Sequence, residues 1–361
     1  MKSRTGIIWL VVLALVSAGA AALYWFRADI ATNILRRAAA AGVGASLKAE
    51  LPDGLHAVFC GTGSPLPDRS RAGPCFAVIA GERVFVFDAG EGAAETLALM
   101  GVNAGDVERV FLTHLHSDHF DGLAPLALQH WAGAAATEPL ALVGPIGTSR
   151  VAAGLNEAYT IDSVYRMAHH GPEIVPASGF GMAASEFAIP EGAADFVVYD
   201  ADGVRITAFR VDHAPVDNAF GYRIEYAGRS IVVSGDTSRA ESVAQAARGA
   251  DLLVHEAIST ELNAIMQDAA NANNRQNVGT IFNDILDYHT SPEDAGAVAT
   301  EAGVDALALT HLLPPTPIPG LDQVFVRAAR TTYAGPVWAM RDGDVISLPR
   351  DGGMVRSHHM R

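Results

Sequence analysis

The chain contains few charged residues, and basic residues are the scarcer kind. Charged residues make up 18% of its 361 residues, and 25 lysines and arginines against 40 aspartates and glutamates give a formal net charge of −15. Half of the residues are hydrophobic, so the composition indicates a packed globular protein rather than a disordered one. A negative field repels polyanions, and the composition therefore disfavours a general nucleic-acid-binding surface.

Cysteine is nearly absent, since only Cys60 and Cys75 occur. No second cysteine or histidine stands near either one at ligand spacing, which argues against a cysteine metal site. Each cysteine ends an apolar segment beside the same loop, so the two thiols face each other if these segments pair as a hairpin. In an oxidising compartment this arrangement favours a disulfide, with two buried free thiols as the alternative.

The N-terminus combines positive charge with a long apolar run. Lys2 and Arg4 precede an uncharged, largely apolar run over residues 6–26, which Arg27 closes. Its 21 residues match the length of a helix that crosses the hydrocarbon core of a bilayer. The run is longer than the core of an ordinary signal peptide, so we favour an uncleaved transmembrane anchor over a cleaved signal. The positive start then places the rest of the chain on the periplasmic side of the inner membrane, or outside the cell if the signal is cleaved.

The sequence pattern divides the chain into an anchor or signal (1–27), a linker (28–54), a main domain (55–350) and a tail (351–361). Within the domain, apolar strand candidates alternate with helical stretches, which indicates an α/β fold with helices covering the sheet faces. Strands are expected at 56–60, 75–80, 83–88, 108–113, 139–143, 204–211, 219–226, 229–234, 251–254 and 305–310. Helices are expected at 91–100, 121–135, 239–248 and 292–302. Residues 144–200 show the least regular sequence pattern and are expected to form an insertion over the functional site.

A dense group of metal-ligand side chains follows the expected strand 108–113. His114, His116, Asp118 and His119 lie within six residues. Imidazole and carboxylate are ligands that Zn²⁺ accepts, and four of them so close together can serve two adjacent ions. A polar turn without a metal is the alternative, but buried strand ends rarely concentrate such groups.

Four more polar side chains follow apolar strands further along the chain: His213, Asp236, His255 and His311. Open α/β sheets bind their ligands at the carboxyl ends of their strands. One such residue would more often be a hydrogen-bonded structural group. Four of them together with the first cluster predict a single convergent site.

Together these motifs resemble the metallo-β-lactamase superfamily and, within it, the tRNase Z-like branch. The matching residues are His114-x-His116-x-Asp118-His119, Asp212-His213, Gly235-Asp236-Thr237, His255-Glu256-Ala257, Leu309-Thr310-His311, and the segments 61–65 and 87–92. The resemblance covers about residues 56–345 and implies an αββα sandwich. It also implies one metal ion on His114, His116 and His213. A second ion would bind Asp118, His119 and His311, with Asp236 bridging the two.

The implied chemistry is that of a metal-dependent hydrolase. Two divalent ions, zinc as the first choice with manganese or iron possible, would lower the pKa of a shared water and supply hydroxide near neutral pH. Asp118 is expected to accept the proton of that water. By resemblance, His255 is the expected proton donor to the leaving oxygen, with a structural role as the alternative. Asp88 and Thr113 are expected to support the ligands.

The remaining histidines show no ligand-type spacing. Core or surface positions are expected for His56, His130 and His289, although His289 also matches a position before a helix in tRNase Z-like proteins, at the rim of their site. His169 and His170 are weak candidates for the substrate cleft. His358 and His359 fall in the expected disordered tail.

The interval between the first metal loop and the third ligand bears on the substrate. In tRNase Z enzymes a basic arm inserted there binds tRNA, whereas residues 137–200 of this chain hold two basic and eight acidic residues. That charge repels phosphate backbones, and an exported enzyme would not meet tRNA precursors. We therefore expect a small ester, with phosphodiesters first, and no nucleic-acid partner. The alternatives are a tRNA 3′-end endoribonuclease, an arylsulfatase- or lactonase-type ester hydrolase, and a non-catalytic metal-binding protein.

Overall fold

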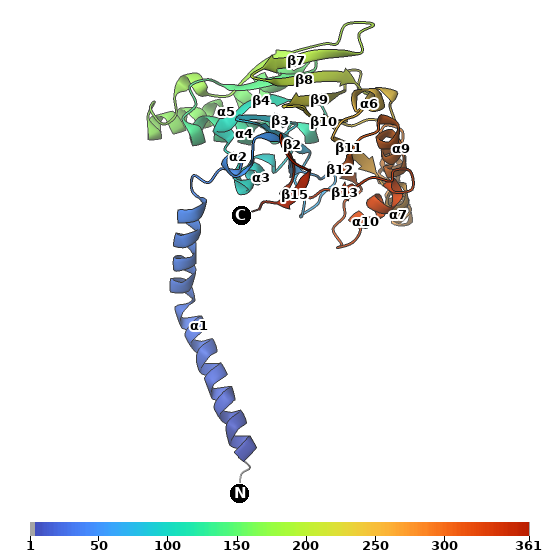
Figure 1. Ribbon diagram of the computed structural model, residues 1–361. Helices are drawn as coiled ribbons and strands as arrows, with labels where there is room; N and C mark the ends of the chain where they lie inside the picture. Colours follow the sequence, from blue (N-terminus) through green and yellow to red (C-terminus); the bar gives the residue numbers. More distant parts are fainter. Residues whose placement is uncertain (1–3, 361) are drawn as a thin grey trace. The chain divides into compact units, whose positions relative to one another are not determined.

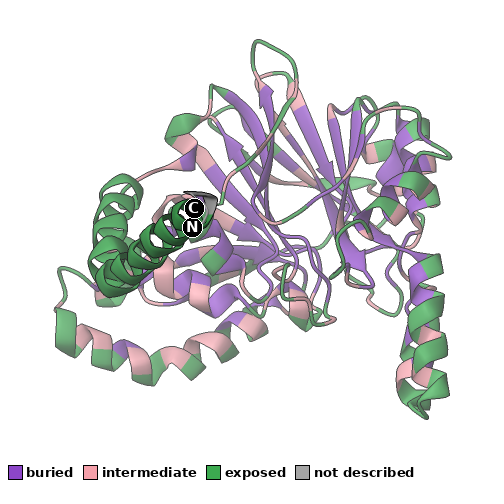
Figure 2. Ribbon diagram, turned by 90° about the horizontal axis from the view of Figure 1, so that it is seen from below, coloured by how far each residue is buried: buried purple, intermediate pink, exposed green. Residues whose placement is uncertain are grey.

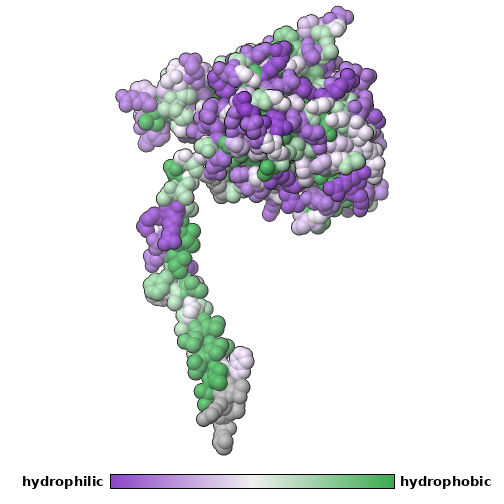
Figure 3. All heavy atoms as spheres, viewed as in Figure 1, coloured by the Kyte–Doolittle hydropathy of each residue, from purple (hydrophilic) through white to green (hydrophobic). Residues whose placement is uncertain are grey.

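The computed structural model describes residues 4–360 and divides into two units, Met1–Ser46 and Leu47–Arg361. The first contains one 39-residue helix, α1 (Arg4–Gly42), whose side chains from Gly6 onward are exposed. Within the described residues it is the one helix long and apolar enough to cross a membrane, and Figure 3 shows its hydrophobic surface. This length and composition suit an anchor and a signal sequence alike. Lys2, part of the expected positive start, lies outside the described residues.

Two β-sheets form the framework of the second unit, as far as residues 47–360 describe it (Figure 1). In spatial order, the first sheet consists of β15 (Val355–His358), β14 (Asp344–Pro349), β1 (Gly54–Gly61), β2 (Cys75–Ala80), β3 (Arg83–Phe87), β4 (Val107–Phe111), β5 (Leu140–Gly144) and β6 (Met182–Glu186). The second consists, in the same sense, of β13 (Val337–Ala339), β12 (Ala306–Leu313), β11 (Leu252–Ile258), β10 (Arg229–Val233), β9 (Phe220–Tyr226), β8 (Val204–Arg210) and β7 (Asp195–Ala201). Both sheets are mixed, because β3 to β6 and β10 to β13 pair in parallel while the other neighbours are antiparallel.

Helices cover the outer face of each sheet. The first sheet packs against α3 (Ala93–Met100), α4 (Leu123–Ala134) and α5 (Thr148–His170), and the short α2 (Leu47–Glu50) precedes β1. The second sheet packs against α6 (Glu241–Ala246), α9 (Pro292–Ala302) and α10 (Asp322–Ala329). A pair of helices, α7 (Thr260–Ala272) and α8 (Gln276–Asp284), follows β11. The result is the expected αββα sandwich.

Burial on both faces explains why the central strands are almost uniformly apolar (Figure 2). Alternate residues point to opposite faces of a strand. Phe59, Phe87 and Tyr222 pack in the core between the two sheets, while Val58 and Ile79 pack beneath the helices of the first sheet. Each such side chain contributes on the order of 1.5–3 kcal/mol when fully buried. The inter-sheet core therefore fixes the strand ends of the two sheets relative to each other.

The expected elements are present, and others were missed. All ten predicted strands and all four predicted helices exist, and α9 begins as expected with the Ser291 hydroxyl accepting a hydrogen bond from Asp294 N. Residues 144–200 are more regular than predicted, because they hold α5, β6 and β7. β6 and β7 are the edge strands of the two sheets. The prediction of a disordered tail is wrong for residues 355–358. These residues form β15, which pairs with β14, and His358 Nδ1 lies 3.0 Å from Asp344 Oδ1.

The two cysteines form a disulfide, which confirms the favoured prediction. Cys60 at the end of β1 is bonded to Cys75 at the start of β2, with 5.0 Å between their Cα atoms. The register of the two strands shifts between Phe59 and Gly61, so that Gly61 faces Cys75. The bridge closes the loop that precedes β2 and is buried.

Replacing both cysteines by alanine should destabilise the domain by about 3 kcal/mol, because the bridge closes a short loop in the unfolded chain. Urea unfolding followed by circular dichroism measures this change. Wild-type protein unfolded in a thiol reductant serves as the control and should lose a similar amount. An unchanged midpoint in both experiments would show that the bridge does not stabilise the fold.

Candidate functional site

The site lies where the ends of strands from both sheets meet. After β4 the chain passes through His114 and His116 into a 3-10 turn over Ser117–His119. Three ligand candidates come from the second sheet: His213 follows β8, Asp236 follows β10, and His311 lies in β12. The sequence predicted these residues because each one follows or ends an apolar strand. In the structure those strand ends lie together at one edge of the sandwich.

The structure brings seven predicted ligands into contact. Atoms from His114, His116 and His213 lie within 4.8 Å of one another, and so do atoms from Asp118, His119 and His311. His116 Nδ1 lies 2.9 Å from His114 Nε2 and 3.2 Å from His213 Nε2. His311 Nε2 lies 3.5 Å from Asp118 Oδ2. The two groups are those that the family resemblance implies for two ions.

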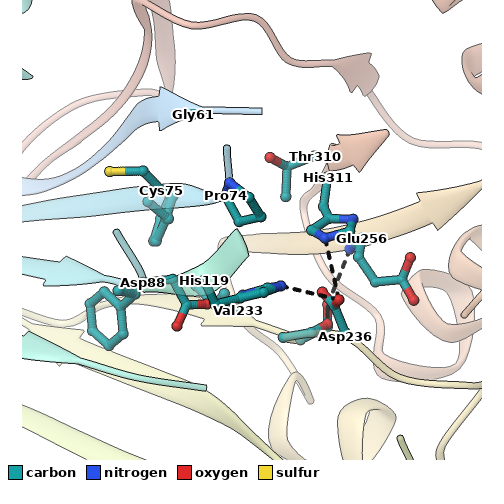
Figure 4. Close-up of a pocket in the computed structure, with 14 residues that line it drawn as sticks. Gly61, Pro74, Cys75, Asp88, His119, Val233, Asp236, Glu256, Thr310 and His311 are labelled. Carbon is teal, nitrogen blue, oxygen red and sulfur yellow. Dashed lines mark hydrogen bonds and ion pairs between the residues drawn. The ribbon is translucent and has the colours of Figure 1, made fainter. Parts of the chain in front are cut away.

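Asp236 lies between the two groups. Its Oδ2 atom is 3.2 Å from His119 Nε2, 3.3 Å from His311 Nε2 and 4.0 Å from His114 Nε2. Figure 4 shows His119 and His311 converging on this carboxylate. A carboxylate with two oxygens in this position can serve a ligand sphere on either side, so the geometry suits a bridging role.

The donor atoms fit divalent cations. Buried polar atoms are normally hydrogen-bonded, yet Asp118 Oδ2 and both ring nitrogens of His311 have no hydrogen-bond partner among the described residues. Nitrogen and oxygen donors of this mixture suit zinc, manganese or iron. The neighbouring groups therefore leave these atoms free to bind a cation.

Other side chains orient the ligands. The carboxylate of Asp88 accepts hydrogen bonds from Thr113 N and Thr113 Oγ1, both at 2.8 Å, and lies 2.8 Å from His119 Nδ1. The carbonyl of Tyr288 lies 2.9 Å from His213 Nδ1. In both histidines the Nε2 atom is thereby turned toward the cluster. Hydrogen bonds of this kind fix the ring and its tautomer.

The carboxylates control the charge of the cluster. Burial lowers the pKa of His119, but Asp236 and Asp88 outweigh burial and raise this pKa well above its usual value. Burial is likewise outweighed at His311, where Asp236 and Asp118 raise the pKa to about 9. Burial would raise the pKa of Asp236, yet His311 and His119 hold it well below its usual value. Positive charge is therefore required here, and either protons on the imidazoles or bound cations supply it.

The histidines of the other group respond differently. Burial and the neighbouring His119 lower the pKa of His114 well below its usual value, and burial also lowers the pKa values of His116 and His213. These three imidazoles are accordingly neutral near pH 7. Neutral imidazole is the form that binds metal ions.

The structure does not bring His255 to the cluster. Its ring is fully buried, and its Nδ1 atom lies 2.8 Å from the backbone carbonyl of Glu256. Successive residues of a strand point to opposite faces, and Glu256, not His255, lines the pocket with His119, Asp236 and His311. His255 lies on the face of β11 that the helices cover, together with the apolar Leu253.

His289 is the functional candidate that the sequence underrated. Its ligand atom lies within 4.8 Å of those of Asp236 and His311, and its Nδ1 atom is 3.2 Å from Glu256 Oε1. The same Glu256 oxygen accepts a hydrogen bond from Thr290 N at 2.9 Å. The available signal was the position of His289 before α9; no spacing rule linked it to the strand ends.

A cleft of about 600 Å³ opens beside Asp118. Its walls come from the loop after β1 and from the metal loop, and Arg69, Arg71, Glu91 and Asp121 lie in them. No residue of the 144–200 segment lines this cleft. His169 and His170, the weak cleft candidates, are exposed at the end of α5 instead.

Comparison with known proteins identifies the family of this chain. The model of the metallo-beta-lactamase superfamily matches residues 69–282. A protein of Mycobacterium bovis named ribonuclease Z is 38% identical over 285 residues, which span 78% of this chain and 94% of that protein. A Mycolicibacterium gilvum protein of the same name is 36% identical over 281 residues, spanning 77% and 91%.

Solved structures agree on the fold. The metallo-β-lactamase-fold protein YhfI of Bacillus subtilis superposes with a TM-score of 0.58 at 21% identity, covering 82% of this chain and all of that one. The short form of human tRNase Z gives a TM-score of 0.55 at 23% identity, covering 81% and 99%.

The chain belongs to the metallo-β-lactamase superfamily. Within it, the chain belongs to the ribonuclease Z-like branch and is a metal-dependent hydrolase. Both sequence-based predictions are confirmed. The identity of its metal ions stays a prediction.

Replacing Asp236 by alanine should remove both metal ions, because this carboxylate lies between the two ligand groups. Metal analysis of the purified protein should fall from about two ions per chain to near zero. The exposed Asp217, in the loop after His213, provides a matched control, and its alanine variant should keep both ions. Two ions retained by the Asp236 variant, with the fold intact by circular dichroism, would contradict the bridging role.

Proposed function

We propose that this chain is an endoribonuclease of the ribonuclease Z type, which hydrolyses a phosphodiester bond of RNA, with tRNA 3′ ends as the first substrate to test. The observation that supports this is the donor set around Asp236 in a chain that spans more than nine-tenths of relatives named ribonuclease Z. The relatives' name supplies the substrate class, and the site supplies the chemistry.

This proposal corrects the expectation of a small ester substrate and no nucleic-acid partner. The relatives named ribonuclease Z overturn it. The charge argument failed because it assigned the acidic segment 137–200 to the neighbourhood of the substrate. Its strands instead lie at the sheet edge formed by β6 and β7, and no residue of the segment lines the cleft at Asp118.

The residues divide the reaction between them. His114, His116 and His213 would hold one divalent cation, and Asp118, His119 and His311 the other, with Asp236 shared. Bound cations of this kind polarise the phosphoryl oxygen and lower the pKa of water. Asp118, whose Oδ2 lacks a hydrogen-bond partner and borders the cleft, is placed to orient the attacking water and accept its proton.

The leaving oxygen needs a proton, and His289 is placed to donate it. Its Nδ1 atom faces the Glu256 carboxylate, which orients the ring and leaves Nε2 as the atom that can donate. We assign this role to His289 in place of His255, whose ring is buried away from the pocket.

The substrate proposal predicts cleavage of a tRNA precursor that carries a 3′ trailer. The metal-loaded full chain should release the trailer, and the Asp236→Ala variant should not. Products are resolved by denaturing electrophoresis, with bis-p-nitrophenyl phosphate as a small probe of the same site. Hydrolysis of the small probe with every RNA left intact would reject the RNA substrate while keeping the hydrolase.

The assignment of His289 predicts that His289→Ala lowers kcat about 100-fold with both metal ions retained, because a general acid contributes on the order of 10²–10⁴. His255→Ala is the comparison variant and should mainly lower stability. Loss of metal from His289→Ala would instead make His289 a ligand.

We propose further that α1 anchors the enzyme in a membrane, with the hydrolase domain outside the cytoplasm. At that location its own substrate would be RNA outside the cytoplasm, and a tRNA precursor serves as the assay substrate for the RNA class. The apolar helix and the Cys60–Cys75 disulfide support this location together, since such bonds persist in oxidising compartments.

A fusion of alkaline phosphatase after residue 50 tests the location. It should be active in intact cells, because this enzyme folds only where its own disulfides form. A fusion of β-galactosidase at the same residue is the reciprocal control and should be inactive. The reverse pattern would place the domain in the cytoplasm.

A further inference from the structure

A second cavity, of about 400 Å³, lies outside the catalytic cleft, between α10 and the edge strand β13. Three arginines from separate parts of the chain line it: Arg330 directly after α10, Arg341 after β13, and Arg356 of β15. None of them lines the cleft at Asp118. We call this cavity the arginine pocket.

Two of the three arginines are held in place by buried carboxylates. Arg341 Nη2 lies 2.8 Å from Asp322 Oδ2, and Arg356 Nη2 lies 2.7 Å from Asp344 Oδ2. Arg330 is exposed, and its side chain makes no hydrogen bond or ion pair with any described residue. The groups around the pocket thus carry three positive charges against two negative ones, and one guanidinium has no counter-ion.

This local charge contrasts with the rest of the chain. Residues 327–361 contain six arginines and three aspartates, a net charge of +3, whereas the whole chain carries −15. The pocket also contains Trp338, whose side chain is partly exposed. Arginine beside an aromatic ring is a combination that binds single-stranded nucleic acid, through phosphate contact and base stacking.

The pocket adjoins the catalytic cleft across the turn 340–342. Arg71, in the wall of the cleft, donates a hydrogen bond to the carbonyl of Met340 on one side of this turn. Asp342 accepts a hydrogen bond from Thr62 N at 2.9 Å, and the carbonyl of Thr62 accepts one from Leu312 N, next to His311. Arg71 in the wall of the cleft and Arg341 in the wall of the arginine pocket thus lie on the two sides of one turn.

We propose that the arginine pocket binds a backbone phosphate of the RNA, away from the bond that is cleaved. The proposal rests on the RNA substrate proposed above. Arg330 supplies the unpaired positive charge, Arg341 and Arg356 supply oriented N–H donors, and Trp338 offers a ring face to the neighbouring base. The pocket adds affinity and leaves the chemical step unchanged.

Arg330→Gln tests the pocket, and Arg327→Gln is the matched control. Arg327 lies one turn earlier on α10, pairs with Glu261 and does not line the pocket. Binding of a fluorescein-labelled single-stranded RNA to the full chain is measured by anisotropy in EDTA, so that no cleavage occurs. Arg330→Gln should raise Kd about fivefold and reduce the slope of log Kd against log salt by about 0.7, the loss of one phosphate contact.

The turnover of bis-p-nitrophenyl phosphate by metal-loaded Arg330→Gln should equal that of the wild type, because this probe is too small to span both sites. If Arg330→Gln binds RNA with the Kd and salt slope of the wild type, the proposal for the pocket is wrong. It is also wrong if Arg327→Gln loses as much affinity as Arg330→Gln, because that would indicate a general charge effect. RNA cleaved by Arg330→Gln with the KM of the wild type would keep the ribonuclease and contradict the pocket. If RNA binding depends on Arg330 but no RNA is cleaved, the proposal for the pocket stands and the proposed ribonuclease activity is wrong.

Discussion

A carboxylate removed from water must be balanced by positive charge, and this requirement organises the whole site. Asp88 and Asp236 are both buried at the junction of the two sheets. An unpaired buried carboxylate would cost several kcal/mol, so histidines have to meet these groups from every side. His119 arrives from the first sheet and His311 from the second, and the inter-sheet core holds the two strand ends in register. The metal site therefore depends on the sandwich and cannot form on either sheet alone.

The backbone at these strand ends is fixed with the same precision as the side chains. Asp88 and His311 adopt φ values of 56° and 46°, a left-handed conformation that non-glycine residues rarely hold without a surrounding structure that enforces it. Beside them, a Cβ atom on Gly90 would overlap the carbonyl oxygen of Asp118, which explains why glycine occupies this position. The metal loop thus rests directly on the backbone of the chain after β3. Side chains that must converge within a few ångströms require this close support.

The sequence predicted those site residues that show a local spacing pattern. It did not predict the residues whose position depends only on how distant segments pack. The sequence shows four of the ligands within six residues and three more at the ends of apolar strands. These could be recognised because residues of metal-ligand type stand at the ends of predicted strands. His289 follows a loop, so its approach to Asp236 depends on how α9 packs and has no local signal. His255 was misassigned because it precedes Glu256 on one strand, and a one-residue shift reverses the face. β6 and β15 were missed because their mostly exposed, polar residues lack the apolar pattern of the central strands, and β13 because it has only three residues. β7 and β14 were missed as well, although both contain apolar residues.

Net charge misled the substrate prediction for a related reason, because it sums over the whole surface, whereas a substrate meets only part of that surface. At physiological ionic strength charges are screened beyond about 8 Å, so distant acidic groups affect a site less than the charges that line it. Two divalent cations would add four positive charges at the point of reaction and change the local net charge from negative to positive. Arg71 at the cleft and Arg330 beyond it extend that positive region along one side of the domain. An acidic protein can therefore bind a polyanion when its few positive groups lie along a single path, and the distribution of charge, not its total, decides the class of substrate.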